Sequence, residues 1–72
     1  MGLSSEQRAA MKKVIIPSMT DDRAVIDARL PCIWEGWKAD QPPGNYTCMD
    51  VGVEPYAGGW WRIVLYVVED PV

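Results

Sequence analysis

The chain has 72 residues and a formal net charge of −3, with apolar residues at 49% of positions and charged residues at 24%. This length allows a single small domain, residues 1–72, and the composition is that of a folded chain rather than a disordered one. A chain of this size buries only about 60% of the surface that its unfolded form exposes. We therefore expect a disulfide, a metal ion or self-association to supplement the core.

Composition argues against several of these supplements and against some partners. Histidine is absent and there are two cysteines, too few ligands for structural zinc, and we expect Cys32 and Cys48 to be free, buried or half-buried thiols. The negative charge argues against a general nucleic-acid binder, which needs Lys and Arg at phosphates. The apolar runs are too short for a membrane span, and we find no secretory signal. We expect a cytoplasmic protein without metal or cofactor, which leaves self-association.

The aromatic residues favour a binding surface. There are four Trp and three Tyr, with no Phe, so every ring carries an N–H or O–H group. Such rings suit positions that are apolar at one end and hydrated at the other, as at interfaces and in ligand pockets.

Residues 4–15 are predicted to form a helix. Ser4 and Gln7 have the spacing of a capping box. Apolar side chains follow at helical spacing, namely Ala10, Met11, Val14 and Ile15. Pro17 disfavours a helical conformation at the preceding residue and so ends the element. A turn is expected at residues 17–22.

Residues 23–30 are compatible with two structures. Strict alternation places Ala24, Ile26, Ala28 and Leu30 on one side, which favours a strand. The alternative is a helix that begins after Thr20, with two Asp residues at its N-terminus, because Ala and Arg favour helices. The apolar residues of 23–30 scatter around a helical wheel, so we predict a strand. Pro31 interrupts it, and residues 32–37 continue in extended form.

Residues 45–53 and 60–68 are predicted to form a hairpin, which follows a loop at 38–45 and is connected by a turn at 54–59. If Asp50 lies opposite Arg62, the same register pairs Val51 with Trp61 and Met49 with Ile63. The sequence thus predicts an α+β fold, in which the N-terminal helix packs on one face of a three-stranded antiparallel meander.

The strand at 60–68 is apolar on both sides, and one helix covers one face only. The second face should then carry an aromatic surface with a central Asp–Arg pair. The candidate interface residues are Tyr46, Asp50, Trp60, Arg62, Val64 and Tyr66, with Trp34 and Trp37 near the edge. An exposed apolar patch of several hundred Å² is unusual in a monomer. The leading hypothesis is therefore a homodimer, or a higher homo-oligomer, that packs sheet face on sheet face.

Two alternatives belong to other functional classes. Trp and Tyr rings beside Glu35, Asp50 or Glu54 could form a pocket for a cationic or flat small molecule. The surface could instead dock on another macromolecule, as in an inhibitor or adaptor. We do not expect an enzyme, because the chain lacks His, the usual base for Ser and Cys nucleophiles.

Overall fold

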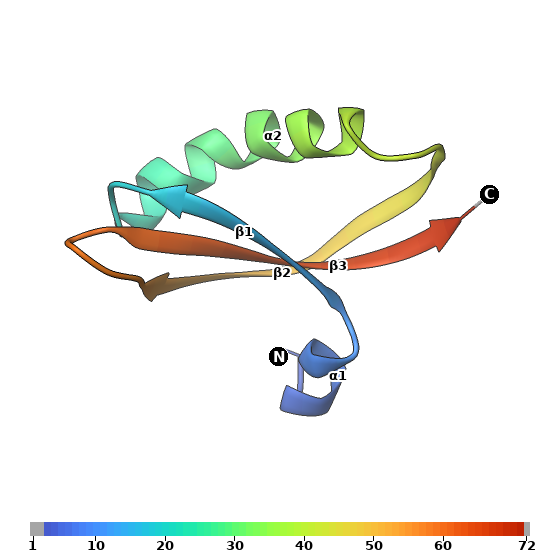
Figure 1. Cartoon of the computed structure of the whole chain (residues 1–72), viewed down its shortest axis with the longest axis horizontal. Helices are drawn as coiled ribbons and strands as arrows, with labels where there is room; N and C mark the ends of the chain where they lie inside the picture. Colours follow the sequence, from blue (N-terminus) through green and yellow to red (C-terminus); the bar gives the residue numbers. More distant parts are fainter. Residues whose placement is uncertain (1–2, 72) are drawn as a thin grey trace.

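The computed structural model describes residues 3–71, which form two helices and three strands. In chain order these are α1 (Ser5–Ala9), β1 (Lys12–Ser18), α2 (Arg23–Ala39), β2 (Gly44–Pro55) and β3 (Trp61–Pro71). The sheet is antiparallel with strand order β1-β3-β2, so α2 connects its two edge strands (Figure 1). The predicted α+β class is confirmed. The predicted meander is wrong, because the first strand of the sheet precedes the long helix instead of following it.

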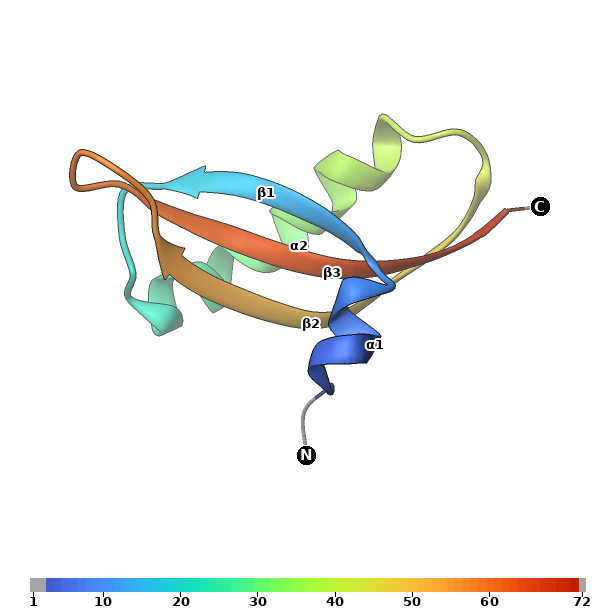
Figure 2. The ribbon, with the colours of Figure 1, turned by 60° about the horizontal axis from the view of Figure 1, so that its bottom comes forward.

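The two helices lie on opposite sides of the sheet (Figures 1 and 2). We call the side that faces α2 the inner face and the opposite side the outer face. Residues of the central strand β3 alternate between them, so that Ile63, Leu65 and Val67 point inward while Val64 and Tyr66 point outward. Each face thus takes alternate residues of the same strand.

The prediction of a helix over residues 4–15 is wrong beyond Ala9. Its start is confirmed, since Ser4 Oγ accepts a hydrogen bond from the Gln7 N–H and Gln7 Oε1 accepts one from the Ser4 N–H. The following residues form β1 instead, because three consecutive β-branched side chains at 14–16 favour a strand. Strand β1 lies at the edge of the sheet. An edge strand tolerates Pro17, which has no N–H to donate to a neighbouring strand.

The predicted strand at 23–30 is also wrong, because these residues belong to α2. The Asp22 side chain accepts a hydrogen bond from the Ala24 N–H and caps the helix. Its core-facing stripe extends past Pro31, which lies within the helix. The stripe consists of Ile26, Leu30, Ile33, Trp34 and Trp37. The stripe is not visible within residues 23–30 alone, because Ile33, Trp34 and Trp37 lie beyond Pro31.

The predicted β2–β3 hairpin is confirmed, but its register differs by four residues. Glu54 rather than Asp50 lies opposite Arg62, and Asp50 lies opposite Tyr66. An even shift leaves these residues on their predicted faces. The tight turn sets the register, because Gly58 and Gly59 adopt positive φ values of 60° and 81° and the chain reverses immediately after Pro55.

A β-bulge between Cys48 and Asp50 changes the faces in the first half of β2. One extra residue in the strand reverses the alternation. Tyr46 and Cys48, predicted to share the outer face with Asp50, therefore lie on the inner face and pack against the core. A bulge of this kind leaves no clear pattern in the sequence.

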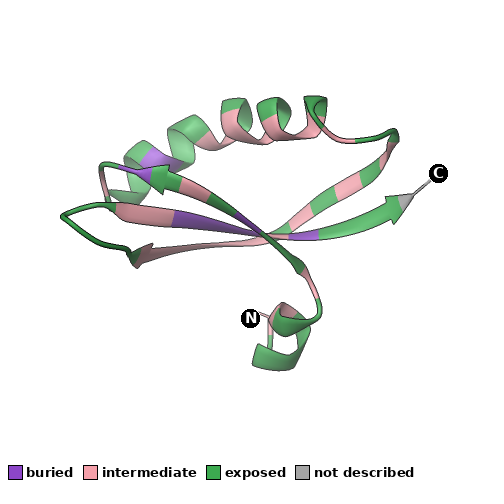
Figure 3. Ribbon diagram, viewed as in Figure 1, coloured by how far each residue is buried: buried purple, intermediate pink, exposed green. Residues whose placement is uncertain are grey.

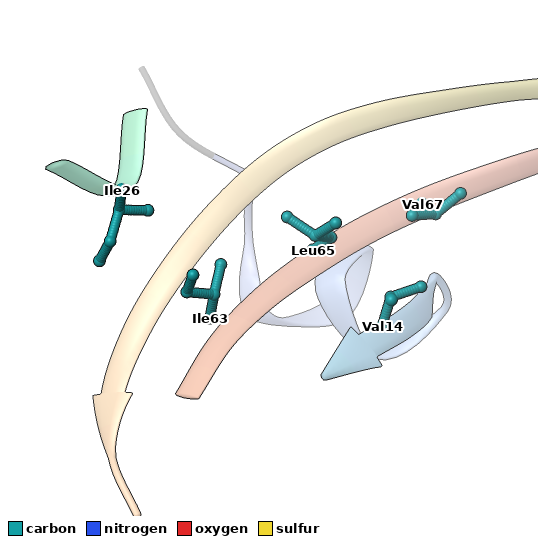
Figure 4. Close-up of a cluster of buried hydrophobic side chains, with 5 residues drawn as sticks. All are labelled: Val14, Ile26, Ile63, Leu65 and Val67. Carbon is teal, nitrogen blue, oxygen red and sulfur yellow. The ribbon is translucent and has the colours of Figure 1, made fainter. Parts of the chain in front are cut away.

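The core lies between α2 and the sheet. Its buried cluster consists of Val14, Ile26, Ile63, Leu65 and Val67 (Figure 4). Three of the five come from β3, while α2 contributes one fully buried residue and several partly buried ones. Most of α2 and all of α1 are half-buried or exposed (Figure 3). The core is therefore thin, as expected for a chain of this length.

Candidate functional site

The eight predicted interface residues are divided between the two sides of the sheet. Five belong to the outer face or its margin, namely Asp50, Trp60, Arg62, Val64 and Tyr66. The other three form an aromatic cluster at the inner face. In this cluster the Trp34 and Trp37 rings stack with centroids 5.3 Å apart, and Tyr46 meets Trp37 edge-on at 5.4 Å. The predicted placement of Tyr46 on the second face is wrong because of the bulge in β2. Trp34 and Trp37, which the sequence placed only near the edge, lie on the inner side because residues 23–39 are helical.

Helix α1 contacts one end of the outer face through Arg8. Arg8 Nη2 donates a hydrogen bond of 2.7 Å to Asp50 Oδ2, and its guanidinium lies 5.4 Å from the centre of the Tyr66 ring. None of the five residues of α1 is buried. Hydrogen bonds from the Val51 N–H and from Arg8 lower the pKa of Asp50. This end of the face is therefore a polar contact between α1 and the sheet.

The remainder of the outer face carries exposed apolar side chains. Ile15 is 47% exposed and Trp60 46%, while Val68, which is 41% exposed, lies beyond Tyr66 at the end of the face near α1. Val64, which lies between Ile15 and Gly52 in the register, is 2% exposed and so serves as a buried base for this surface. Exposed apolar side chains are therefore present on the outer face, although Val64 itself is buried.

The hairpin end of this face has an aromatic corner. Pro17, Tyr56, Ala57 and Trp60 surround a shallow apolar hollow of about 250 Å³. The Arg62 guanidinium lies 5.5 Å from the centre of the Tyr56 ring and forms an ion pair with Glu54. The corner thus combines apolar rings with a paired charge, a combination that is common at protein interfaces.

The edges of the sheet are poor sites for adding another strand. On β2 the Val51 N–H donates to Asp50 Oδ1 at 2.9 Å, and the Val51 carbonyl accepts from Arg23 Nη1 at 3.5 Å. Pro55 has no N–H to offer, and Pro17 is its counterpart on β1. Proline and paired polar groups on an edge strand oppose edge-to-edge association. Association through the face of the sheet is therefore favoured over association through its edges.

The acidic side chains expected to recognise a cation are already paired within the chain. Asp50 pairs with Arg8 at 2.7 Å, Glu35 pairs with Lys38 at 3.1 Å, and Glu54 pairs with Arg62. The two stacked Trp rings also have cations above them. Lys38 Nζ lies 5.4 Å from the Trp34 ring centre, and Lys12 Nζ lies 5.7 Å from that of Trp37. The arrangement is therefore not that of an open acidic cage for a cationic ligand.

A groove between α2 and β2 was missed by the sequence reasoning. It has a volume of about 370 Å³ and is lined by Asp27, Leu30, Pro31, Trp34, Cys48, Val51 and Leu65. Both cysteines are free thiols, as expected, although Cys32 is exposed rather than buried. Burial raises the pKa of the Cys48 thiol. The groove exists only because residues 23–39 are helical, and a strand prediction for residues 23–30 does not contain it.

Comparison with known proteins adds no relative. Neither a scan against protein-family models nor searches of curated proteins and of solved structures find a match for this chain. Within residues 3–71, neither helix has the length and apolar character that crossing a membrane requires. Function is therefore inferred from the geometry of the chain itself.

Proposed function

We propose that this protein is a self-associating interaction module, in which the outer face of one copy packs on the outer face of a second. The observation that carries this proposal is the exposure of Ile15 and Trp60 near the buried Val64. Apolar surface gains about 25 cal/mol for each Å² removed from water. A small domain with a thin core has the most to gain from covering such a patch.

The outer face can complement a second copy of itself. Its β1 side carries Lys13 and Ile15, whereas its β2 side carries Gly52 and the acidic Glu54. A two-fold axis parallel to the strands would place β1 of one copy against β2 of the other. Ile15 would then meet the partner's Gly52, and Pro17 would lie level with the partner's Glu54. The exposed Ile15 side chain of one copy would thus face a glycine of the other, where no side chain occupies the space.

The space above Gly52 supports this arrangement. An added Cβ at Gly52 would meet only the Tyr66 ring, at 3.8 Å, within a 4 Å radius. Helix α1 lies at the opposite end of the face, where Arg8 holds it against Asp50 and Tyr66. The interface is therefore limited to the half of the face near the β2–β3 hairpin, where Trp60 and Tyr56 lie.

Sedimentation equilibrium at micromolar concentration tests the proposal. We expect the wild-type chain to sediment as a dimer, and the variants Ile15→Glu and Trp60→Glu to sediment as monomers with an unchanged circular dichroism spectrum. Both side chains are exposed in the single chain, so their replacement should not disrupt its fold. Met19→Glu is the matched control, since Met19 is 77% exposed and lies outside the strands, and this variant should remain dimeric.

A monomeric wild type at the highest soluble concentration would contradict the proposal. So would a dimer that withstands both Glu substitutions, which would place the interface elsewhere. Formation of a complex only when a different macromolecule is added would favour an inhibitor or adaptor instead.

A further inference from the structure

We propose that the groove between α2 and β2 is a binding site for a small, neutral, apolar molecule that carries one hydrogen-bond donor. The groove lies on the inner side of the sheet, so this site is separate from the outer face and does not depend on its association. Its volume of about 370 Å³ is at the lower end of the range of roughly 300–1,000 Å³ typical of ligand pockets.

The lining of the groove favours an apolar ligand. Leu65, which is 1% exposed, belongs to the buried core beneath it. Leu30 and Trp34 come from α2, and Val51 and Cys48 come from β2. Because burial raises the pKa of the Cys48 thiol, this group is neutral near pH 7 and presents a polarisable, weakly polar surface.

Pro31 gives the groove a hydrogen-bond acceptor. In an α-helix the N–H of residue 31 would donate to the carbonyl oxygen of Asp27, but proline has no N–H. Pro31 lies inside α2, and both it and Asp27 line the groove. The helix therefore leaves one carbonyl oxygen without its usual donor beside an apolar surface. Asp27 and Pro31 are exposed, so water reaches this oxygen, and a ligand N–H or O–H can replace that water.

The charges near the groove favour a neutral ligand over a cationic one. The Asp27 carboxylate accepts a hydrogen bond of 3.0 Å from Arg23 Nε and forms an ion pair with it. The acidic group at the groove is thus already neutralised by its own helix. This distinguishes the groove from the acidic, aromatic pocket that the sequence indicated.

Two matched probes test the site by NMR with ¹⁵N-labelled protein. Indole is apolar, has two fused rings and carries one N–H donor, while 1-methylindole has the same rings without the donor. We expect indole to shift the backbone amides of Leu30, Trp34, Cys48 and Val51, and to bind about 2- to 10-fold more tightly than 1-methylindole, the ratio that one net hydrogen bond gives.

Two substitutions separate the acceptor from the apolar lining. Pro31→Ala restores the N–H that Asp27 lacks, so indole should bind this variant no more tightly than 1-methylindole does. Leu30→Trp should fill the groove and abolish binding of both probes. Ala28→Trp is its matched control, because Ala28 is exposed on the same helix and does not line the groove, and it should bind both probes normally. Circular dichroism shows whether each variant remains folded.

The proposal is overturned if millimolar indole leaves the groove amides unshifted, or if the shifts map to the corner formed by Tyr56 and Trp60. It is also overturned if Pro31→Ala keeps the preference for indole. The Ile15→Glu variant keeps the two proposals distinguishable, because loss of the dimer in that variant should leave indole binding unchanged.

Discussion

The inner and outer faces of the sheet are formed from alternate residues of the same strand, yet they are covered very differently. On the inner face Ile63, Leu65 and Val67 are 1–2% exposed beneath α2. On the outer face Val64 is buried, while Ile15 and Val68 are 47% and 41% exposed. The apolar pattern of β3 is similar on both sides, so the crossover through α2 decides which face becomes the core.

Even the inner face is only partly covered. Helix α2 contributes one fully buried residue, Ile26, and the groove beside Leu30 and Trp34 remains open. On the outer face, within residues 3–71, Arg8 makes the charged contacts between α1 and the sheet, with Asp50 and Tyr66. The substitutions below test whether the two faces differ as strongly in energy as they do in exposure.

The largest expected difference is between Leu65 and Val68. Leu65→Ala removes a fully buried side chain beneath α2 and should lower the free energy of unfolding by about 2–5 kcal/mol. Val68→Ala, on the exposed outer face, should lower it by less than about 1 kcal/mol. Urea unfolding followed by circular dichroism measures both, and equal losses would mean that the outer face is as well packed as the inner one.

Pro31→Ala should sharpen the contrast in the opposite direction by stabilising the cover of the inner face. A proline inside a helix costs about 3 kcal/mol relative to alanine. Part of this gain is lost because the unfolded chain becomes more flexible. We expect a net increase of about 1–3 kcal/mol in thermal unfolding experiments. An unchanged melting temperature would show that α2 already relieves the interruption at this position.

Two glycine substitutions compare the covering helix with the outer face. Gly36→Ala lies in α2, where nothing comes within 4 Å of the added Cβ, and should stabilise the chain by about 1 kcal/mol. Gly52→Ala places a methyl group 3.8 Å from the Tyr66 ring, and should add about 0.5 kcal/mol. Both are measured in an Ile15→Glu background, in which the monomer should predominate.

In the wild-type background the two glycine variants should diverge. Gly52→Ala should weaken the dimer, since it occupies the space proposed for the partner's Ile15, while Gly36→Ala should not. Sedimentation equilibrium measures this difference. A dimer of unchanged affinity in Gly52→Ala would contradict the proposed arrangement of the two copies.

The smallest expected effect is the pH dependence of the contact between α1 and the outer face. The pKa of Asp50 is lowered in the folded chain by the Val51 N–H and by Arg8. Its stabilising contribution is therefore present above the unfolded-state pKa of about 3.9 and is lost as the pH falls through the lower folded value. Asp50→Asn should be less stable than wild type near neutral pH, and the difference should shrink in acid. A difference that persists in acid would assign the effect to packing.

The sequence by itself determined the features that depend on neighbouring residues. The Ser4–Gln7 capping box, the loop before β2 and the glycine turn before β3 follow from local backbone preferences and local hydrogen bonds. The apolar character of both sides of β3 is equally visible in the residues, and it led to the outer face. The faces of Asp50, Arg62, Val64 and Tyr66 were predicted correctly, although the register was not.

Only the tertiary structure decided the conformation of residues 12–18 and 23–39. Val14 and Ile15 fit a helical stripe, and residues 23–30 fit a strand, but each adopted the other structure. Pairing with β3 buries Val14 opposite Leu65, and a helical 23–39 brings Ile26 to the same cluster. Local propensities differ by less than about 1 kcal/mol per residue, whereas burying such a side chain contributes about 1.5–3 kcal/mol. The free energy gained by long-range burial therefore outweighed local propensity. The same burial beneath α2 determined which face of the sheet remained uncovered.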